Sequence, residues 1–200
     1  HSLRTAAYEN LSSRFFYGWV ILAVTSLAIF SSGPGQSHTF SVFVGPITAD
    51  LGLSKQAISI AYGLATLVAA LLLPKMGKLV DVYGPQRMTF WVAAALGLAC
   101  VLFGAVGGPI TLALGFGALR FLGQGSLMLN CANLVAQWFN AKRGFAMSLM
   151  ALGFGISMAV HPPLGQYLIG EYGWRSAWLI LGALTWIILL PPVVLLVHDK

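Results

Sequence analysis

The sequence is short of charge. Only 8% of its residues are charged, whereas 58% are hydrophobic, and the mean hydropathy is +0.84. A soluble domain carries about 25% charged residues. Between Phe15 and Ala49 there is no Asp, Glu, Lys or Arg. A chain of this composition lacks the polar surface of a water-soluble protein and is built for a lipid environment.

Cysteine is also scarce. The two cysteines, Cys100 and Cys131, both fall in apolar runs, which excludes a disulfide framework of the secreted type. The net charge of +6 does not indicate nucleic acid as a partner, because the basic residues are scattered singly and form no stripe. The first apolar run is too long for a signal peptide and no small-residue cleavage site follows it.

Long uncharged runs divide the chain instead. A helix needs about 20 residues to cross about 30 Å of hydrocarbon, and lipid forces each segment to bond its own backbone amides. The sequence therefore predicts an all-α membrane protein with six transmembrane helices, within 15–45, 57–74, 88–106, 110–138, 145–169 and 178–197. The polar breaks between them are expected at 46–56, 75–87, 107–109, 140–144 and 170–177. We expect a cytoplasmic tail at 1–14, a six-helix bundle at 15–197 and the start of a central loop at 198–200.

The positions of Lys and Arg predict the orientation, because basic residues concentrate on the cytoplasmic side. With a cytoplasmic N-terminus, the other side receives only Lys55 and Arg175. The cytoplasmic side receives Arg4, Arg14, Lys75, Lys78, Arg87, Lys142, Arg143 and Lys200. Both termini are therefore expected in the cytoplasm, and the location is expected to be the plasma (inner) membrane.

A weak internal echo recurs at a spacing of 88 residues. The matching pairs are Gly35 with Gly123, Gln36 with Gln124, Pro74 with Pro162, Gly77 with Gly165, and Arg87 with Arg175. They fall at equivalent points of the first three and last three spans. Because a unit of three spans is odd, its second copy must be inverted, and inverted three-helix repeats are a building plan of secondary transporters.

The first span contains a helix-breaking stretch, Gly33-Pro34-Gly35, with polar Gln36 and His38 beside it. Such a break is tolerated at membrane depth where the freed backbone meets protein or a water-filled cavity. We expect both polar side chains to line a site. The alternative is a kink that lets the helix fit its neighbours, with Gln36 bonded to another helix.

Arg120 is the costliest residue of the spans, at about 2.5 to 3.5 kcal/mol on insertion scales. It should face the interior, with Gln124 on the same face. An Arg can hold a carboxylate through two parallel hydrogen bonds, or it can brace the broken first helix, and the sequence favours neither role. A second polar stripe follows it, and which stripe faces a cavity stays open: Ser126, Asn130, Asn133 and Gln137.

Three further positions complete the candidate site. Tyr62 can offer a hydroxyl to a carboxylate or simply pack, and Asn130 is included from the second stripe. His161 precedes two prolines and can change charge near physiological pH, or it can be a structural hydrogen-bonded residue. Since no span contains Asp or Glu, a coupling proton would have to use His38, His161 or another part of the protein.

Three motifs resemble the major facilitator superfamily. They are the segment from Gly77 to Arg87 (GKLVDVYGPQR), the fourth-span stretch RFLGQG from Arg120, and YGWR from Tyr172. The stretches RFFYGWVIL from Arg14 and FSVFVGPI from Phe40 are similar to the monocarboxylate and oxalate/formate branch. One difference is Val82, where the family usually has a second basic residue.

The resemblance implies a function. The family has twelve spans, so this chain resembles an N-terminal half, either cut from a longer transporter, which we favour, or pairing as two copies. The resemblance implies secondary active transport of small organic anions, monocarboxylate-like, by alternating access, as symport or antiport and with protons as a candidate coupling ion. It also implies that one segment sets which side is open, through Gly77, Lys78, Asp81, Gly84 and Arg87; a solvated turn is the alternative role for Asp81.

The remaining alternatives are a transporter of another small solute with the same fold and a non-transporting half that docks to a partner. An intramembrane hydrolase using Ser126 and His161 is a remote possibility, because the sequence around Ser126 does not form a nucleophile turn. We therefore expect no enzyme, no catalytic residue, no metal and no cofactor. The expected partners are the lipid bilayer, the anion and a C-terminal six-helix half.

Overall fold

The computed structural model describes residues 9, 12 and 16–198. Of the predicted tail, only Glu9 and Ser12 are therefore described, and Arg4, Arg14 and Lys200 lie outside the described residues. The described part of the chain is helical over nearly its whole length and contains no strand. The predicted all-α class is confirmed.

The helices follow one another with short joints. Their order is α2 (Gly18–Ser31), η1 (Gly33–Gly35), α3 (Ser37–Phe40), η2 (Ser41–Phe43), α4 (Val44–Leu51), α5 (Lys55–Tyr83), α6 (Pro85–Phe103), α7 (Pro109–Leu119), η3 (Arg120–Leu127), α8 (Met128–Trp138) and α9 (Arg143–Leu196). The element η3 is a π-helix. The 54-residue α9 consists of two limbs, because its backbone leaves the helical region at Gly173.

Several predicted breaks are much shorter than expected. The helix α4 continues to Leu51, α5 continues to Tyr83, and the first limb of α9 continues to the residue before Gly173. The expected breaks at 46–56, 75–87 and 170–177 are therefore wrong in extent. Charged residues mark where a helix leaves the apolar layer, but they do not end it. An end needs a backbone feature that stops the hydrogen-bond ladder.

Glycine provides that feature at two joints. Gly84 between α5 and α6 has φ 83° and ψ 148°, and Gly173 between the limbs of α9 has φ 80° and ψ 161°. Residues with a side chain rarely adopt a positive φ, so glycine is required at both joints. Pro85 then begins α6 at a position where its missing amide costs nothing. The chain reverses twice through the same backbone conformation.

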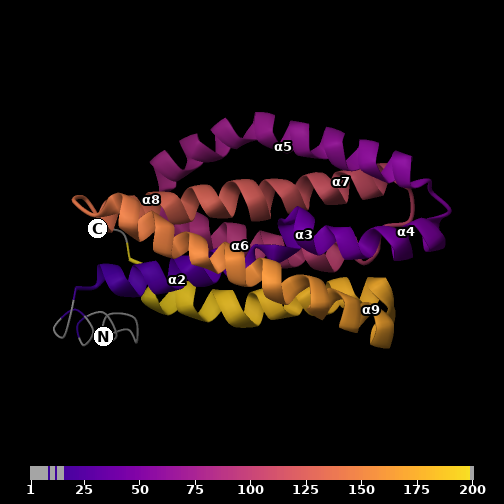
Figure 1. The fold of residues 1–200 in the computed structure, drawn as a ribbon. Coiled ribbons are helices and arrows are strands. Elements are labelled where there is room, and N and C mark those ends of the chain that lie inside the picture. The colour runs from indigo at the N-terminus through magenta and orange to yellow at the C-terminus, as the bar shows by residue number, and fades with distance from the viewer. Residues whose placement is uncertain (1–8, 10–11, 13–15, 199–200) are drawn as a thin grey trace.

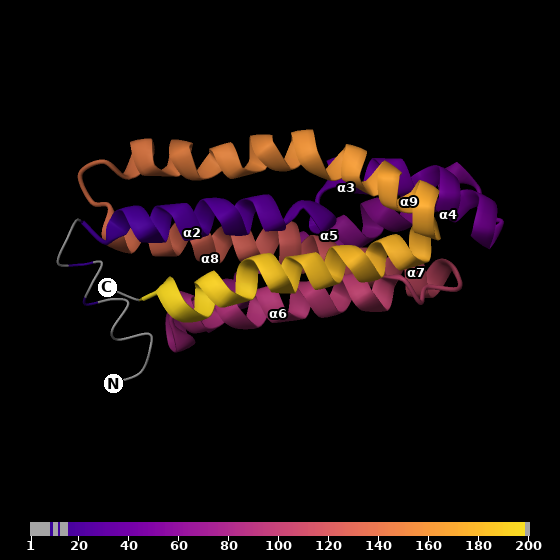
Figure 2. The same cartoon turned by 90° about the horizontal axis from the view of Figure 1, so that it is seen from below.

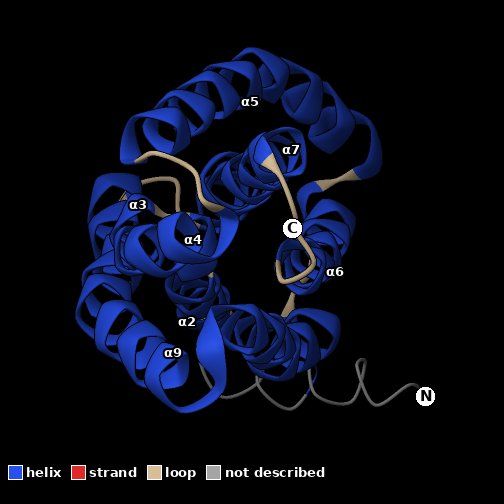
Figure 3. Ribbon diagram, turned by 90° about the vertical axis from the view of Figure 1, so that its right-hand side faces the viewer, coloured by secondary structure: helices blue, strands red, loops and turns tan. Residues whose placement is uncertain are grey.

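The helices run side by side along one long axis (Figure 1). Tyr17, just before α2, donates a hydrogen bond of 2.6 Å from its hydroxyl to the carbonyl of Leu196, so α2 begins where α9 ends. Figure 2 shows α2 between the two limbs of α9. Seen along the bundle, α5 lies at the outer edge beside α7 (Figure 3).

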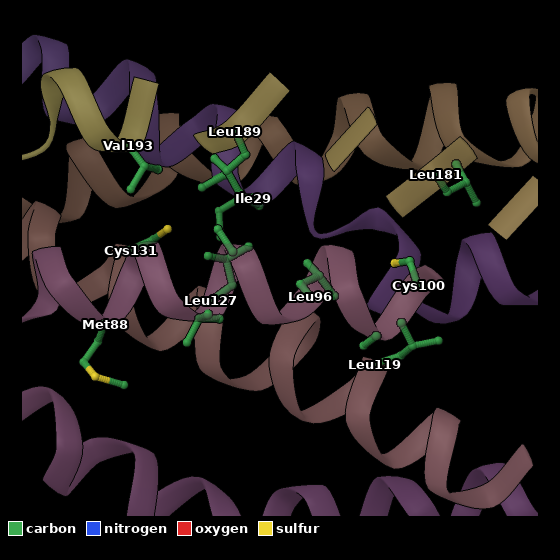
Figure 4. Close-up of a cluster of buried hydrophobic side chains, with 14 of the residues drawn as sticks. Ile29, Met88, Leu96, Cys100, Leu119, Leu127, Cys131, Leu181, Leu189 and Val193 are labelled. Carbon is green, nitrogen blue, oxygen red and sulfur yellow. The ribbon is translucent and has the colours of Figure 1, made fainter. Parts of the chain in front are cut away.

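The core lies where α2, α6, η3 and the second limb of α9 meet. Ile29, Leu96, Leu127 and Leu189 come from these four elements and are fully buried (Figure 4). Cys100 and Cys131 are also fully buried, and both are free thiols. This common core holds the inner helices in fixed positions around the polar residues described below.

The outer surface is strongly apolar. Large exposed side chains follow the length of α5, among them Ile60, Leu64, Leu67 and Leu71, and Leu71 is 70% exposed. By length and composition, four described helices can cross a membrane: α5, α6, the run Pro109–Trp138 and α9. Such a surface identifies an integral, multi-pass membrane protein.

Candidate functional site

The predicted helix break is present. Gly33-Pro34-Gly35 forms the single turn η1, and Gln36 is extended, with φ −101° and ψ 151°, before α3 begins at Ser37. The amides of Gly35 and Gln36 donate to the carbonyls of Ser32 and Gly33, both at 2.9 Å. The break is therefore a defined turn, with its own hydrogen bonds, between α2 and α3.

The break lies directly against the π-helix η3. A Cβ placed on Gly35 would lie 2.4 Å from the carbonyl oxygen of Leu119 and 2.8 Å from the Cα of Gly123. These distances are too short for any side chain, so the two backbones touch at a pair of glycines. Single π turns inside α-helices are frequent at functional sites, because they redirect the side chains around them.

Arg120, the first residue of η3, points into this junction. Its Nε donates to Thr66 Oγ1 of α5 at 3.2 Å, and its Nη1 donates to the carbonyl of Gly35 at 3.3 Å. The guanidinium carbon lies 5.0 Å from the centre of the Tyr62 ring. Within the described residues, no hydrogen bond engages Nη2. Arg120 thus makes contacts that brace the broken first helix, and it retains donors that could hold a carboxylate.

Tyr62 belongs to an aromatic cluster beside Arg120. Its ring stacks on Phe40 with centroids 4.9 Å apart and meets Phe116 edge to face at 5.3 Å. The Tyr62 hydroxyl is buried and has no hydrogen-bond partner within the described residues. A cavity of about 10 Å³ adjoins the cluster and is lined by Pro34, Gly35, Gln36, Phe40, Tyr62, Phe116, Leu119, Arg120 and Trp178. The space suffices for about one water molecule.

Gln36 lines the same cavity and is 3% exposed. Its amide nitrogen donates to Ser32 Oγ at 3.2 Å, a bond within its own chain segment. The predicted candidates Gln36, Tyr62 and Arg120 are therefore brought together around one small cavity. Gln36 is not bonded to a neighbouring helix in the described structure, unlike the alternative interpretation of the kink.

The two polar stripes of the fourth span differ in burial. Gln124 is exposed, whereas Ser126 and Asn130 are fully buried and their side-chain polar atoms have no partner within the described residues. Gln124 and Asn130 therefore lie on different sides of this span, and neither lines the small cavity beside Arg120.

His38 and His161 lie together through a serine that the sequence analysis did not single out. His38 Nε2 is 3.1 Å from Ser157 Oγ, which is 3.0 Å from His161 Nδ1. The His161 ring also packs on Gly33, where a Cβ would be 2.5 Å from ring atoms. The spacing of four between Ser157 and His161 could have indicated a shared helix face. The partnership with His38, 119 residues earlier, could not be read from spacing.

These contacts also bear on the hydrolase alternative. The imidazole Nδ1 of His161 is bonded to Ser157, and Ser126 Oγ has no partner within the described residues. The pairing of Ser126 with a histidine, which a serine hydrolase requires, is not found. In the described part of the chain, no group of three or more His, Cys, Asp or Glu is arranged to hold a metal ion.

The segment from Gly77 to Arg87, which is predicted to set which side of the transporter is open, is helical apart from Gly84. Gly77, Lys78 and Asp81 lie in the last turns of α5, Gly84 is the joint, and Arg87 follows in the first turn of α6. The loop expected here is thus reduced to one glycine. Lys78, Asp81 and Arg87 are all exposed, and no ion pair of Asp81 occurs within the described residues.

The opposite end of the bundle holds an ion pair that sequence analysis missed. Arg175 Nη2 lies 2.9 Å from Asp50 Oδ2, and Arg175 Nη1 donates to the carbonyls of Gly104 at 3.1 Å and Val106 at 2.7 Å. Trp174 Nε1 donates to the same carboxylate at 3.2 Å. This group ties the ends of α4 and α6 to the start of the second limb of α9.

Comparison with known proteins places the chain among transporters. Residues 18–200 match the sequence profile of the Major Facilitator Superfamily. The oxalate:formate antiporter of Oxalobacter formigenes is 26% identical over 180 residues, covering 90% of this chain and 42% of that protein. An uncharacterized 38 kDa protein of Thermoproteus tenax is 29% identical over 174 residues, covering 87% of this chain and 43% of that protein.

Another relative is the probable sulfoacetate transporter of Cupriavidus necator, which is 27% identical over 146 residues, covering 71% of this chain and 31% of the relative. The chain spans less than half the length of these curated relatives.

Proposed function

The chain belongs to the Major Facilitator Superfamily, and we propose that it forms the N-terminal half of a secondary active transporter of small organic anions. The family match and the transporter relatives indicate a transporter and not an enzyme. The names of two relatives mention oxalate, formate and sulfoacetate, which are all small anions. The proposed substrates are short monocarboxylates and dicarboxylates, carried by alternating access across the plasma membrane.

The proposed architecture is two inverted units of three spans, with limbs at 18–51, 55–83, 85–103, 109–138, 143–172 and 174–196. The matching backbone conformations of Gly84 and Gly173 support it, because they occupy the second joint of each unit. The break η1 and the π-helix η3 occupy the first span of each unit. In the proposed complete transporter, a C-terminal half would close the site from the other side.

The proposed orientation has both ends of the chain in the cytoplasm. Lys75, Lys78 and Arg87 lie around the joint between α5 and α6, and Arg143 begins α9 at the same end of the bundle (Figure 1). Lys55 and Arg175 lie at the opposite end. The excess of basic residues at the first end supports a cytoplasmic location for it.

The observation that carries the substrate proposal is the position of Arg120. It is a partly buried cation inside an apolar bundle, next to a helix break, and its Nη2 group is not engaged within the described residues. A guanidinium with free donors prefers a planar anion such as a carboxylate. Tyr62 and Gln36, which line the same cavity, can add neutral donors.

The cavity in this conformation is too small for a carboxylate, so substrate access requires the helices around it to move. Such movement is the essence of alternating access, in which one repeat shifts against another around a fixed site. Asp81, Gly84 and the basic residues near them are proposed to set the balance between the two open states. Their place at the α5–α6 joint allows this role without contact with the substrate.

The test uses the complete transporter that contains this half, in proteoliposomes and in detergent. Exchange of radiolabelled oxalate, formate and lactate identifies the anions carried. Substrate-dependent thermal shift is then measured on the native form, Arg120→Lys and Arg120→Gln. The Lys form keeps the charge but loses the planar fork, so affinity should fall by about 1.5 to 3 kcal/mol, which is about 10- to 150-fold. The Gln form should lose more.

The matched control is Arg143→Gln, which removes an exposed charge at the start of α9 and should leave affinity unchanged. If Arg120 only braces the break, both Arg120 variants will lower the unliganded melting temperature while the ligand-induced shift stays the same size in all three forms. That result would remove the ligand role. Absence of exchange with every carboxylate would favour another small solute as substrate.

A further inference from the structure

His38, Ser157 and His161 form a continuous hydrogen-bonded chain between two elements that are distant in sequence. His38 belongs to α3, just after the helix break, whereas Ser157 and His161 belong to the first limb of α9. The two contacts measure 3.1 Å and 3.0 Å, and the imidazole centroids are 6.4 Å apart. We call these three residues the histidine chain.

The histidine chain is open at one end and closed at the other. His38 is partly exposed, whereas Ser157 is 0% and His161 is 6% exposed. The surrounding groups are mostly aromatic: Phe154 meets the His38 ring at 5.4 Å, and Phe30 of α2 meets the His161 ring at 4.9 Å. Among the described residues that form or contact the histidine chain, the two histidines are the titratable groups.

A second cavity lies at the closed end. It measures about 40 Å³ and is lined by His161 together with Phe30, Ser31, Leu164, Leu181, Leu184, Thr185 and Ile188. The hydroxyl of Ser31 is buried there without a partner within the described residues, and Thr185 Oγ1 donates to the carbonyl of Leu181. The space and the polar groups suit one water molecule, which would extend the histidine chain beyond His161.

His161 Nδ1 has partners suited to both of its protonation states. Ser157 Oγ can donate to the unprotonated nitrogen at 3.0 Å, and the backbone carbonyl of Ser157, 3.3 Å away, can accept from the protonated one. A site that satisfies the same atom with and without a proton can bind and release it without leaving a buried polar group unpaired. Because the two imidazoles share a single hydroxyl, the pair is suited to bind one added proton and not two.

We propose that the histidine chain is the site at which this half of the transporter binds the proton that accompanies the anion. This inference rests on the proposed transport function. A proton from the open side binds Nδ1 of a neutral His38 that already carries a proton on Nε2, the nitrogen that faces Ser157. The Nε2–H bond breaks as the Nε2 proton passes to Ser157 Oγ, and the original Ser157 O–H bond breaks as its proton forms a bond to His161 Nδ1. Ser157 ends as the neutral hydroxyl it was, and the positive charge has moved from His38 to His161.

The position of the histidine chain couples this proton transfer to the arrangement of α3 and α9. His38 is attached to the break and its partners are attached to α9, so a movement of α3 away from α9 lengthens the contact between His38 and Ser157. A proton on His161 is then separated from the open side. The proton would be taken up in one arrangement of the two elements and held in the other, as a coupled transporter requires.

The test measures protons and anions together. Proteoliposomes of the complete transporter, loaded with a fluorescent pH dye, receive the radiolabelled carboxylate, out of oxalate, formate and lactate, that the native form exchanges fastest. The quantity compared is the number of protons moved per anion, because this ratio does not change when the overall transport rate changes. Ser157→Ala removes the connecting hydroxyl and should lower this ratio about ten-fold or more. His38→Gln, at the open end, supplies an independent second variant with the same expectation.

Ser148→Ala is the matched control, because Ser148 lies on the same limb of α9 and donates only to the carbonyl of Gly144 in the described structure. Its ratio should equal that of the native form. A native form that exchanges the anion without moving protons would overturn the proton site and leave the proposed function standing. An unchanged ratio in Ser157→Ala and His38→Gln would do the same. Absence of anion exchange in the native form would instead overturn the proposed function, and with it this inference.

Discussion

Replacing Gly35 with alanine tests whether the contact between the helix break and η3 holds the site together. The new Cβ would lie 2.4 Å from Leu119 O and 2.8 Å from the Cα of Gly123. Both are backbone atoms, so no side chain can rotate away and the two segments must separate. Overpacking of this kind costs about 1 to 3 kcal/mol.

A partial gain opposes this loss, because alanine reduces the freedom of the unfolded chain by about 0.4 to 1 kcal/mol. The net expected effect of Gly35→Ala is therefore a loss of about 0 to 2.6 kcal/mol, about 1.3 kcal/mol at the midpoint, in the free energy of unfolding. The separation would also draw the Gly35 carbonyl away from Arg120, so that substrate-induced stabilisation should weaken as well.

The measurement is thermal unfolding in detergent micelles, followed by tryptophan fluorescence. Gly63→Ala is the control, because Gly63 lies inside α5 with open space around its Cα and alanine favours a helix by about 1 kcal/mol. Gly123→Ala should resemble Gly35→Ala, since its Cβ would lie 2.8 Å from the Cα of Gly35. The double variant should lose less than the sum, because the first change already separates the pair. Equal melting temperatures for Gly35→Ala and Gly63→Ala would refute the contact argument.

Two further predictions concern the ends of the bundle. Arg175→Ala should lower the free energy of unfolding by about 2 kcal/mol, because it removes hydrogen bonds to two carbonyls and a partly exposed ion pair with Asp50. Thermal unfolding measures this loss, with Lys55→Ala as the control. Equal losses in the two variants would count against the tie between helix ends. Asp81→Asn should change the turnover of anion exchange more than the affinity, since Asp81 is exposed at the α5–α6 joint and remote from Arg120. A large loss of affinity at unchanged turnover would contradict the second prediction.

Much of the fold could be predicted from the sequence because lipid leaves few choices. Long uncharged runs must be helices, and Gly33-Pro34-Gly35 could only interrupt one. The helix ends are harder to predict, because the charges at Lys75 and Lys78 predict that α5 ends there, whereas it continues to Tyr83. The true stop is the positive φ of Gly84, and a single glycine among many gives no clear signal in the sequence.

The site could be predicted only residue by residue. The cost of burying a charge indicated that Arg120 faces the interior, and the weak periodicity of the fourth span located two polar stripes. The hydrogen-bond partners of Arg120 are Thr66 and Gly35, which belong to other elements, so no local pattern identifies them. Ser157 was missed for the same reason, because a serine in an apolar span is ordinary until His38 is brought beside it.

The contact between Gly35 and Gly123 has a consequence for symmetry. The two glycines are separated by 88 residues, the offset of the internal echo, so they are equivalent positions of the two proposed units. Under a two-fold relation, equivalent residues touch only where they lie close to the rotation axis, one on each side of it. The glycine pair therefore marks where the symmetry axis of the two proposed units passes, at the contact between η1 and η3. Arg120, about one turn before Gly123 in η3, therefore lies close to this symmetry axis as well.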